Sequence, residues 1–432
     1  MADPPSPPNS IHAIISYADT YVQPLLDTAL SSLPLTPLPA STAESSLPTT
    51  PLLIWTQYEL LPFTHATSHP SSVLINSYIY RKALIRKHYL ATTVRNWVIK
   101  NPSSSLQQHV QSSVEFELDY AEFLDDAFME ADGEELVASL GGNEGREKGE
   151  REWWILKAGM AERGGGIRLF STMGELEGIF EGWDPESDDE GEVEVEGDRD
   201  GEVKVRGEKD EGIVTSQMRH FVAQRYVGRP LLFGEGFESR GRKFHVRTYV
   251  VAVGALKVFV YRRMLALFAG REYSEPGKED DPNEELNGHL TNTCLQTGER
   301  EGSVHEFWLL PDHAGDLGKG WKEKAFEQIC STTGELFEAA AKGMMIHFQP
   351  LPNAFEIYGL DYLIDDSGNA WLLEVNAFPD FAQTGGDLKN LIAGLFDGVV
   401  EVAVKPFFGL QAEDGRASGD LVEVLNIDLG RR

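Results

Sequence analysis

Cysteine is almost absent from this sequence, with only Cys294 and Cys330 in 432 residues. One pair of cysteines cannot cross-link a small secreted scaffold, and no Cys/His cluster has the spacing of a zinc site. Apolar runs of about eighteen residues are also missing, and the N-terminal segment lacks the basic and apolar regions of a secretory signal. We therefore expect a protein that is neither secreted nor membrane-spanning, located in the cytoplasm.

Positive charge is scarce as well, because 38 Lys and Arg face 69 Asp and Glu, giving a net charge of -31. Residues 115–151 contain 13 acidic and 3 basic residues (net -10), and residues 181–212 contain 15 acidic and 4 basic residues (net -11). No basic face is wide enough to bind a phosphate backbone, so we expect no nucleic-acid partner. We interpret the two acidic segments as solvated, disordered inserts in preference to docking surfaces.

The first hundred residues predict a small N-terminal α/β domain. An amphipathic helix is expected at 11–32, a Ser/Pro-rich loop at 31–51, a strand within 52–60 and a basic amphipathic helix at 81–99. The basic side chains of the last helix are also compatible with an ordinary solvated face.

From Trp153 onward the pattern changes to short β-rich runs separated by glycine, which favours an α+β or α/β enzyme over a sandwich or a bundle. Helices are expected at 172–180, 319–342 and 387–404. The predicted strands lie within 153–157, 166–170, 221–227, 243–268, 355–366 and 369–378.

Two strands near the C-terminus, FEIYGLDYLI and AWLLEVNAFP, are joined by a turn-forming run and predict a β-hairpin. In that hairpin Asp361 and Glu374 fall opposite each other, with Cβ atoms about 4.5–5.5 Å apart. Asn376 shares the face of Glu374, because side chains alternate along a strand. Two carboxylates and an amide oxygen suit Mg²⁺ that also binds substrate phosphates. A hairpin with a merely solvated polar face remains the alternative.

The segment WWILKAGMAERGGGIRLFST places Lys157 at the end of an apolar strand, before a loop that contains Arg163 and Gly164, Gly165 and Gly166. Glycines allow backbone N–H groups to approach phosphate oxygens, and a lysine anchored on a strand supplies positive charge. The loop is not a Walker A sequence, because the Gly-Lys-Ser/Thr ending is missing. An ordinary hairpin loop would also explain the glycines.

Six blocks, in order, resemble the tubulin–tyrosine ligase and ligase-like family of the ATP-grasp superfamily. They extend from about Asn76 to Asp387, and six blocks in family order are more specific than any one of them. The blocks are IYRKAL, WWILKAGMAERGGGIRLF, QRYVGRPLLF, GRKFHVRTYVV, GHLTNTCLQ and FEIYGLDYLIDDSGNAWLLEVNAFP.

The resemblance implies an α+β ATP-grasp fold, in which two α+β lobes enclose a nucleotide cleft. We expect a small N-terminal domain at 1–100, an acidic linker or insert at 101–152, and a tail at 411–432. The lobes are expected at 153–265, which includes the acidic insert 181–212, and at 266–410.

The resemblance also implies the roles of individual residues. Lys157 is expected to bind phosphate, the loop from Arg163 to Gly166 to cover the β- and γ-phosphates, and Lys82 to lie near the phosphate tail, although a surface lysine is a comparable interpretation. The remaining expected nucleotide or acceptor contacts are Gln224, Arg225, Tyr226 and Val227 at the adenine, Lys243 and Arg247 in the cleft, and Thr291 and Asn292 near nucleotide or substrate.

The implied reaction uses ATP and Mg²⁺, the metal being held by Asp361, Glu374 and Asn376. A carboxylate attacks the γ-phosphorus, and an amine then displaces phosphate from the acyl phosphate to form an amide bond. Arg163, Lys243 and Arg247 are the expected catalytic cations, which act by positioning and charge neutralisation. The expected partners are a free amino acid and a protein acceptor, tubulin or another protein.

Two positions depart from the family pattern. His245 stands where KFDIR would place an aspartate, and Leu267 stands where the family often has an arginine. A strongly acidic chain also repels acidic tubulin tails at long range, which favours another acceptor. Two alternatives follow: a nucleotide-binding interaction module with lost or altered ligase activity, and an ATP-grasp enzyme that acts on a small molecule.

Overall fold

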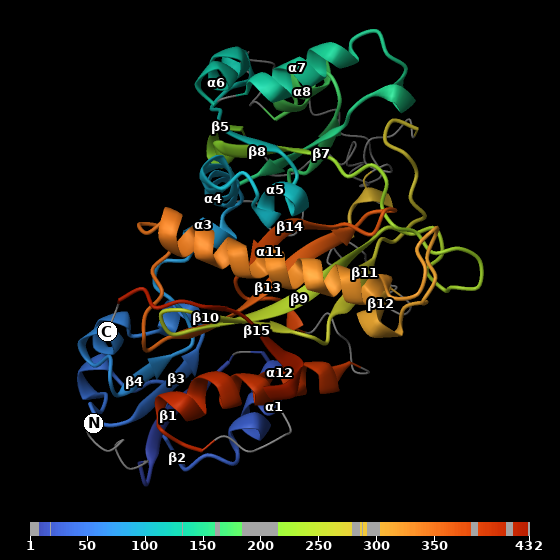
Figure 1. The fold of residues 1–432 in the computed structure, drawn as a ribbon. Coiled ribbons are helices and arrows are strands. Elements are labelled where there is room, and N and C mark those ends of the chain that lie inside the picture. Colours follow the sequence, from blue (N-terminus) through green and yellow to red (C-terminus); the bar gives the residue numbers. More distant parts are fainter. Residues whose placement is uncertain are drawn as a thin grey trace, which may run out of the picture. The chain divides into compact units, whose positions relative to one another are not determined.

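The protein is described from a computed structural model, which covers residues 8–17, 19–131, 133–159, 165–183, 215–278, 286, 288–291, 303–381, 388–411 and 418–430. Its chain divides into two compact units (Figure 1). Unit 1 comprises Met1–Gln111, Val227–Ser274 and Asp281–Arg432. Unit 2 comprises Ser112–Tyr226 and Glu275–Asp280. Among the residues described, no helix combines the length and apolarity needed to cross a bilayer.

Unit 1 begins with a parallel four-stranded sheet in the order β2-β1-β3-β4. All five residues of β3 are buried, as expected for a parallel strand covered on both faces. The chain passes from β1 to β2 on one side, and β3 pairs with the other side of β1, so the strand order reverses between β1 and β3. The strands are β1 (Ile11–Ser16), β2 (Leu35–Pro37), β3 (Leu52–Thr56) and β4 (Val73–Ile75), and the helices between them are α1 (Val22–Leu30) and α2 (Phe63–Ser68).

The prediction of one helix at 11–32 is wrong in its first half. Residues 11–16 form β1, because the apolar IHAII run pairs with β2 and β3 and has Ile11 and Ala13 buried. Pairing with other strands therefore overrides the local helical spacing. The helix starts only at Val22, where Asp19 Oδ1 accepts hydrogen bonds from the N–H groups of Tyr21 (2.6 Å) and Val22 (3.2 Å). The loop expected at 31–51 also contains β2.

The main sheet of unit 1 has seven strands, in the order β12-β11-β9-β10-β15, with β13 pairing β9 and β14. Strands from both sides of residue 265, where the sequence predicts a boundary between lobes, belong to this one sheet. β9 pairs along its length with β13 on one edge, while β11 and β10 share its other edge. The strands are β9 (Phe244–Val253), β10 (Lys257–Tyr261), β11 (Leu265–Phe268), β12 (Val304–Glu306), β13 (Phe355–Ile364), β14 (Ala370–Asn376) and β15 (Leu421–Asn426).

Alternating side chains of β9 enter two different cores. Val246 and Val250 join the core on the face covered by α11 (Trp321–Gly343), and Tyr249 and Val251 join the core that includes α1 and α12 (Lys389–Val399). Figure 1 shows α11 along one face of the sheet, with α12 and α1 together on the other. β9 is therefore buried on both faces, and polar groups on it must find partners within the protein.

The basic helix predicted at 81–99 is divided in two. Arg86 has extended backbone angles (φ -100°, ψ 121°) and separates α3 (Lys82–Ile85) from α4 (Lys87–Lys100). The short α5 (Ser105–His109) follows, and both α4 and α5 pack on α11. The helix predicted at 319–342 is confirmed as α11. The one predicted at 387–404 is formed by α12, a π-helical turn at Val400–Val404 and then α13 (Lys405–Phe407).

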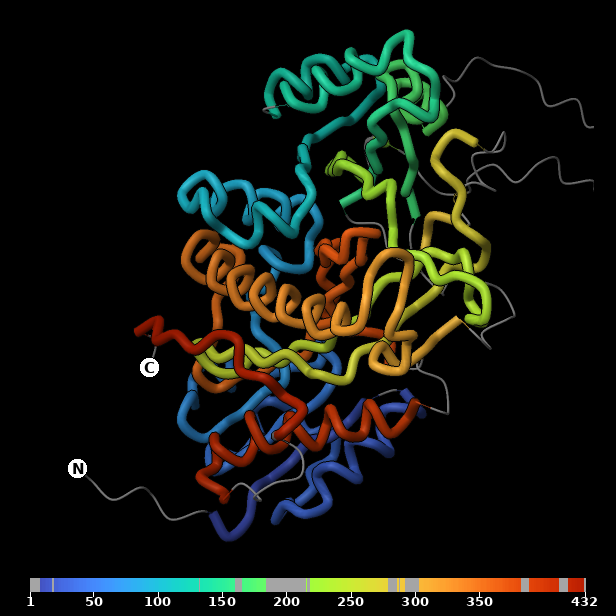
Figure 2. Tube along the Cα trace, turned by 45° about the vertical axis from the view of Figure 1, so that its right-hand side comes forward, coloured from blue at the N-terminus to red at the C-terminus, as the bar shows by residue number. Residues whose placement is uncertain are grey.

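Residues 421–426 of the predicted tail belong to the sheet. They form β15, which pairs antiparallel with β10 at the edge of the main sheet, and Figure 2 shows this red segment beside the yellow-green β10. α11 packs closely on β15, because a Cβ atom at Gly334 would lie 2.6 Å from the carbonyl oxygen of Val424. Glycine at this position allows the helix to approach the strand.

Unit 2 contains an antiparallel sheet in the order β5-β8-β6-β7. Its strands are β5 (Ser113–Glu117), β6 (Trp154–Ala158), β7 (Arg168–Phe170) and β8 (His220–Arg225). Its helices are α6 (Leu124–Glu130), α7 (Glu134–Asn143), α8 (Met173–Glu181) and α9 (Thr215–Met218). The helix predicted at 172–180 is thus confirmed as α8.

The interpretation of residues 115–151 as a disordered insert is wrong. Within this segment Phe116, Leu124 and Phe128 are buried in the core of unit 2, together with Trp154 and Phe221. The acidic residues of this segment that the structure describes lie between the apolar positions and are exposed or half-buried. The net charge of the segment therefore does not reveal the apolar pattern. The second acidic segment, 181–212, lies outside the described residues from 184 onward.

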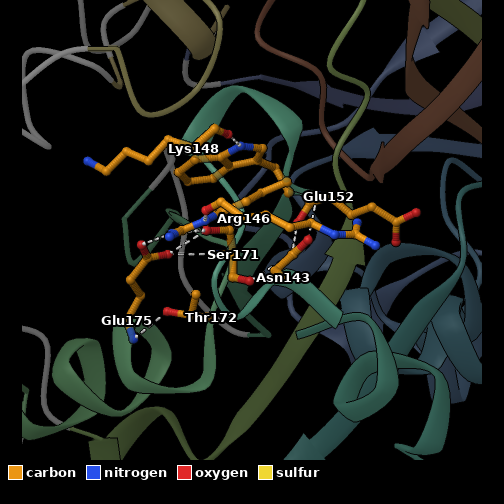
Figure 3. A network of polar contacts seen from close by, with 9 residues as sticks. Asn143, Arg146, Lys148, Glu152, Ser171, Thr172 and Glu175 are labelled. Atoms are coloured by element: carbon orange, nitrogen blue, oxygen red, sulfur yellow. Dashed lines mark hydrogen bonds and ion pairs between the residues drawn. The ribbon is translucent and has the colours of Figure 1, made fainter. Parts of the chain in front are cut away.

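A polar network attaches α7 to the rest of unit 2 (Figure 3). The fully buried Asn143 donates to the carbonyl oxygens of Glu152 and Ser171, both at 2.8 Å, and its Oδ1 accepts from the N–H of Glu152 at 3.0 Å. Thr172 caps α8 by accepting from the N–H of Glu175. These contacts fix three separate segments of unit 2 to one another.

We expect Asn143→Ala to lower the free energy of unfolding by about 1–3 kcal/mol, because it leaves buried backbone groups without partners. Denaturant unfolding followed by circular dichroism would measure the change. The control is Asn426→Ala, which removes only an exposed 3.1 Å contact with Glu423 and should stay within about 0.5 kcal/mol of the wild type. Equal losses in the two variants would contradict a special role for Asn143.

Candidate nucleotide and metal site

Lys157 lies near the end of β6 in unit 2, where the sequence predicts a phosphate-binding lysine. Its side chain is 8% exposed, and its Nζ donates to Gln224 Oε1 at 2.7 Å. The two residues meet because β6 and β8 are neighbouring antiparallel strands, with Ile155 opposite Gln224. The structure therefore brings together Lys157 and the first residue of the segment expected at the adenine.

The rest of that segment, Arg225 to Val227, spans the junction between the units. The N–H of Arg225 donates to the carbonyl of Ser112 (2.9 Å), and the N–H of Tyr226 donates to that of Trp153 (2.8 Å). Arg225 also pairs with Glu152 through its guanidinium at 2.7 Å. Because these two N–H groups already have acceptors, the adenine contacts predicted for this backbone stay predictions.

The glycine loop between β6 and β7 is only partly described. Gly165 is exposed, and Gly166 is buried with a φ of 70°, a backbone angle that favours glycine. Arg163 and Gly164 lie outside the described residues, as does Asn292. Their roles stay predictions.

In unit 1 the predicted hairpin is confirmed, and it joins the three predicted metal ligands. Asp361 pairs with Glu374 and Gly359 pairs with Asn376 in the register of β13 and β14. Asn376 Nδ2 lies 3.2 Å from Asp361 Oδ2 and 3.4 Å from Glu374 Oε1. Their role as ligands stays a prediction, but they form one cluster on one face of the sheet.

Arg247 completes this cluster from the neighbouring strand β9, where it stands opposite Asp361. Its guanidinium donates to both oxygens of Asp361, from Nε at 2.5 Å and from Nη2 at 3.1 Å. Both residues are less than 10% exposed. Although burial acts in the opposite direction, Arg247 and then His245 hold the pKa of Asp361 below its ordinary value. Asp361 is therefore ionised at neutral pH.

His245 lies on the same face of β9, at the position where the family pattern has an aspartate. Its Nδ1 is 2.5 Å from Thr291 Oγ1, and its Nε2 is 3.5 Å from Asp361 Oδ1. Burial lowers the pKa of His245, so the ring is neutral at neutral pH. Thr291, expected near nucleotide or substrate, is thus tied to the cluster through His245. Leu267 stands directly opposite His245 on β11 and is fully buried.

The role of Lys82 near the phosphate tail stays a prediction, and the structure adds a second lysine of the same region, Lys87. Lys82 is exposed at the start of α3, whereas Lys87, at the start of α4, has its Nζ 3.8 Å from Glu374 Oε2. Lys87 could not be identified from the sequence, because the break at Arg86, which places Lys87 on a separate helix, is not visible in the helical spacing. Lys243 is buried directly before β9, two residues from His245.

The cluster fits Mg²⁺ chemically, although the described residues include no group of three His, Cys, Asp or Glu side chains arranged to hold a metal. Mg²⁺ takes oxygen ligands, keeps several waters and shares substrate phosphates, so two carboxylates suffice. Asp361 retains acceptor capacity beyond its bonds to Arg247, and rotation of the Asn376 amide turns its oxygen toward the carboxylates. These residues present hard oxygen donors with a neutralising arginine beside them.

A second buried ion pair, which the sequence does not reveal, links Arg81, the residue before α3, to β13. Arg81 Nη1 lies 2.7 Å from Glu356 Oε1, and both residues are less than 10% exposed. Tyr358 donates to Glu356 at 2.8 Å. Arg81 belongs to the IYRKAL block and Glu356 to the FEIYG block, but the sequence alone does not show that these two blocks lie side by side.

The predicted site residues therefore form two groups, one in each unit. Lys157 and Gln224 belong to unit 2, and Arg247, Thr291, Asp361, Glu374 and Asn376 belong to unit 1. Their convergence around one nucleotide stays a prediction.

Comparison with solved structures defines the class of protein. The chain is similar to the C-terminal domain of Pby1 from K. lactis, described as an ATP-grasp enzyme that interacts with the mRNA decapping enzyme Dcp2. The two share 37% identity with a TM-score of 0.69, over 98% of this chain and 100% of that one. The chain thus has the ATP-grasp fold, which implies ATP binding.

The family follows from sequence. The model of the tubulin-tyrosine ligase family matches residues 67–411, and the chain belongs to that family. It is 41% identical to a probable tubulin–tyrosine ligase of Schizosaccharomyces pombe, over 92% of each chain. It is 45% identical to the probable tubulin–tyrosine ligase PBY1 of Saccharomyces cerevisiae, over 81% of this chain but only 45% of that protein. The family and fold expected from the six blocks are confirmed.

Proposed function

We propose that this protein is an ATP- and Mg²⁺-dependent ligase that joins an amino acid to a protein carboxylate through an acyl phosphate. The observation that best supports the proposal is the cluster of Asp361, Glu374 and Asn376, with Arg247 bonded to both oxygens of Asp361. Membership of a ligase family and the ATP-grasp fold support it independently. The scarcity of cysteine favours action in the cytoplasm.

In the proposed reaction, an oxygen of the acceptor carboxylate attacks the γ-phosphorus and ADP leaves. The amine nitrogen then attacks the acyl carbon, phosphate leaves, and the nitrogen loses a proton. Bound Mg²⁺ would supply charge neutralisation at the phosphates. Arg247 keeps Asp361 ionised and oriented, and Lys87 offsets the charge of Glu374. Lys157 contributes a fixed ammonium, held in place by Gln224. These groups act by positioning and electrostatics.

The test is incubation of the purified chain with ATP, Mg²⁺, a mixture of isotope-labelled amino acids and candidate acceptor proteins, followed by mass spectrometry. ADP formation coupled to an acceptor mass increase equal to one amino acid residue is the expected result. ATP binding with no modified protein under any of these conditions would contradict the proposal.

Lys157→Met is expected to weaken ATP binding about tenfold to a hundredfold, because it removes a buried ammonium from the predicted phosphate site. Calorimetric titration of ATP into the variant would measure this change. Lys257→Met, which removes an exposed lysine of β10, is the matched control and should bind ATP like the wild type. Equal ATP affinity in wild type and Lys157→Met would remove Lys157 from the site.

A second candidate is a nucleotide-binding interaction module. His245 and Leu267 favour it, because a neutral imidazole and a buried leucine replace a carboxylate and a carboxylate-binding arginine of the family pattern. The described interaction of the similar K. lactis domain with Dcp2 is consistent with such a role. Tight ATP binding without turnover, combined with ATP-dependent binding of a protein partner, would select this candidate.

A further inference from the structure

A groove of about 650 Å³ opens in unit 1 at the ends of β1 and β3, and Asp361, Glu374 and Asn376 are not among its lining residues. Its walls come from three short segments. The lining residues are Tyr17, Asp19, Thr20 and Val22 after β1, Gln57 to Glu59 after β3, and Phe378 to Phe381 after β14. The volume lies within the range of pockets that hold drug-sized ligands, and it exceeds what one amino acid fills.

The groove occupies a position that parallel sheets favour for binding. The first two walls follow the carboxyl ends of β1 and β3, and the strand order β2-β1-β3-β4 reverses between these two strands. In open α/β sheets, ligands bind outside the carboxyl ends of the strands at such a reversal. The topology therefore marks this end of the sheet, independently of which side chains line it.

Aromatic rings form much of the lining. Tyr17, Tyr58 and Phe378 all face the groove, and Phe378 is 45% exposed although it is large and apolar. The rings of Tyr58 and Phe378 already bind a cation, because the guanidinium of the buried Arg81 lies 3.8 Å and 4.5 Å from their centroids. Arg81 is neutralised by Glu356, so it adds little positive charge to the groove.

The charged residues of the groove are acidic. Of the described residues that line it, Asp19, Glu59 and Asp380 are carboxylates and none is basic. Carboxylates beside aromatic faces attract ammonium and guanidinium groups, through charge and through the ring quadrupole, and they repel acidic segments.

A buried polar group lies next to the groove and has no hydrogen-bond partner. The hydroxyl of Tyr249, which is 0% exposed, has none among the described residues. Its ring stacks on Phe381, one of the lining residues, with centroids 5.5 Å apart. On β9, Tyr249 stands two residues from Arg247, so the two side chains are on the same face of the strand. Tyr249 therefore supports the wall of the groove from behind and does not line it.

From these observations we propose that the groove binds a basic, extended segment of the acceptor protein, with a Lys or Arg side chain held between the carboxylates and over the rings. The groove is two residues from Asn376 along the chain, so a segment bound there would lead toward the carboxylate cluster. The identification of this segment as part of the acceptor rests on the proposed function. The binding of a basic segment to the groove does not depend on that function, and it can be measured in the absence of ATP turnover.

The experiment uses the full chain and a fluorescein-labelled ten-residue peptide of alternating Lys and Ala, with binding followed by fluorescence anisotropy. The double variant Glu59→Gln/Asp380→Asn should bind the peptide about tenfold more weakly than the wild type, and so should Phe378→Ala. Phe378→Tyr, which keeps the ring, should bind like the wild type. A Glu/Ala peptide of equal length should not bind.

The matched control is the double variant Glu235→Gln/Glu272→Gln, which removes the same charge from exposed side chains of unit 1 outside the groove. It should bind like the wild type, which separates local recognition from the attraction of a chain with net charge -31. Melting temperatures of all variants would verify that they are folded.

Equal weakening in the groove and control variants would overturn the proposal. So would complete competition by free arginine at the concentration at which the peptide binds, because the groove would then recognise a free amino acid. Peptide binding that follows this pattern in a protein without ligase activity would retain the groove and reject the proposed reaction. Ligation that proceeds unchanged in the groove variants would retain the reaction and reject the groove as an acceptor site.

Discussion

Replacing Arg247 by Met is expected to lower the free energy of unfolding by about 3–5 kcal/mol. The change leaves Asp361, which is 4% exposed, as a buried carboxylate without its arginine, and this is the costly way to break a buried ion pair. Urea denaturation followed by tryptophan fluorescence would measure the loss. An exposed pair offers the matched comparison: Arg225→Met removes the contact with Glu152 and should cost at most about 1 kcal/mol.

The double variant Arg247→Met/Asp361→Leu isolates the cause. If the loss in the single variant comes from an uncompensated carboxylate, removing Asp361 as well should recover most of the stability. No recovery would show that Arg247 stabilises β9 and β13 mainly by packing. Neither variant is expected to turn over ATP, because both lack groups of the carboxylate cluster.

Replacing Glu374 by Gln is expected to reduce Mg²⁺-dependent ATP turnover by about 10²–10³-fold, the usual cost of removing one electrostatic contact to a reacting group. The side chain of Glu374 is 30% exposed and pairs loosely with Lys87, so stability should change by less than about 1 kcal/mol. The two readouts together distinguish a metal ligand from a structural carboxylate, which would change stability but not turnover.

Glu423→Gln, on the exposed side of β15 in the same sheet, is the matched control for Glu374→Gln. It should leave both turnover and stability unchanged. Turnover that persists in Glu374→Gln, with the same dependence on Mg²⁺ concentration as the wild type, would remove Glu374 from the metal site.

The sequence predicted best where a strong local pattern coincides with tertiary pairing. The hairpin of β13 and β14 carries its own turn, so its existence follows from local rules. The position of Asp361 directly opposite Glu374 also depends on a one-residue register shift between Asp361 and Tyr362, which the turn does not specify. By contrast, the contact of Arg247 with Asp361 depends on β9 pairing with β13, which is more than a hundred residues away in the sequence. The alternation of side chains along a strand predicts which face a residue occupies, but it does not identify the neighbouring strand. The ion pair of Arg81 with Glu356 could not be predicted either, because it also joins segments that are far apart in the sequence.

Charge was the least reliable guide to the fold. Residues 115–151 were interpreted as a disordered insert, yet the apolar positions between the carboxylates build one side of unit 2. A net charge averaged over the segment does not record that Phe116 and Phe128 share a buried face. Helical spacing of the apolar residues predicted a helix at 11–16, but these residues form β1. Pairing with β2 and β3, which local spacing does not record, determines the structure there.

The pairing of β15 with β10 has a consequence for how the chain matures. During synthesis, β10 emerges long before its partner, and one edge of the sheet stays open until the residues of β15 have left the ribosome. Unit 2 is almost continuous in sequence and needs no such distant strand. Assembly of unit 1 is therefore delayed relative to that of unit 2, and a nascent chain interrupted before Leu421 would expose the apolar edge of β10 to aggregation.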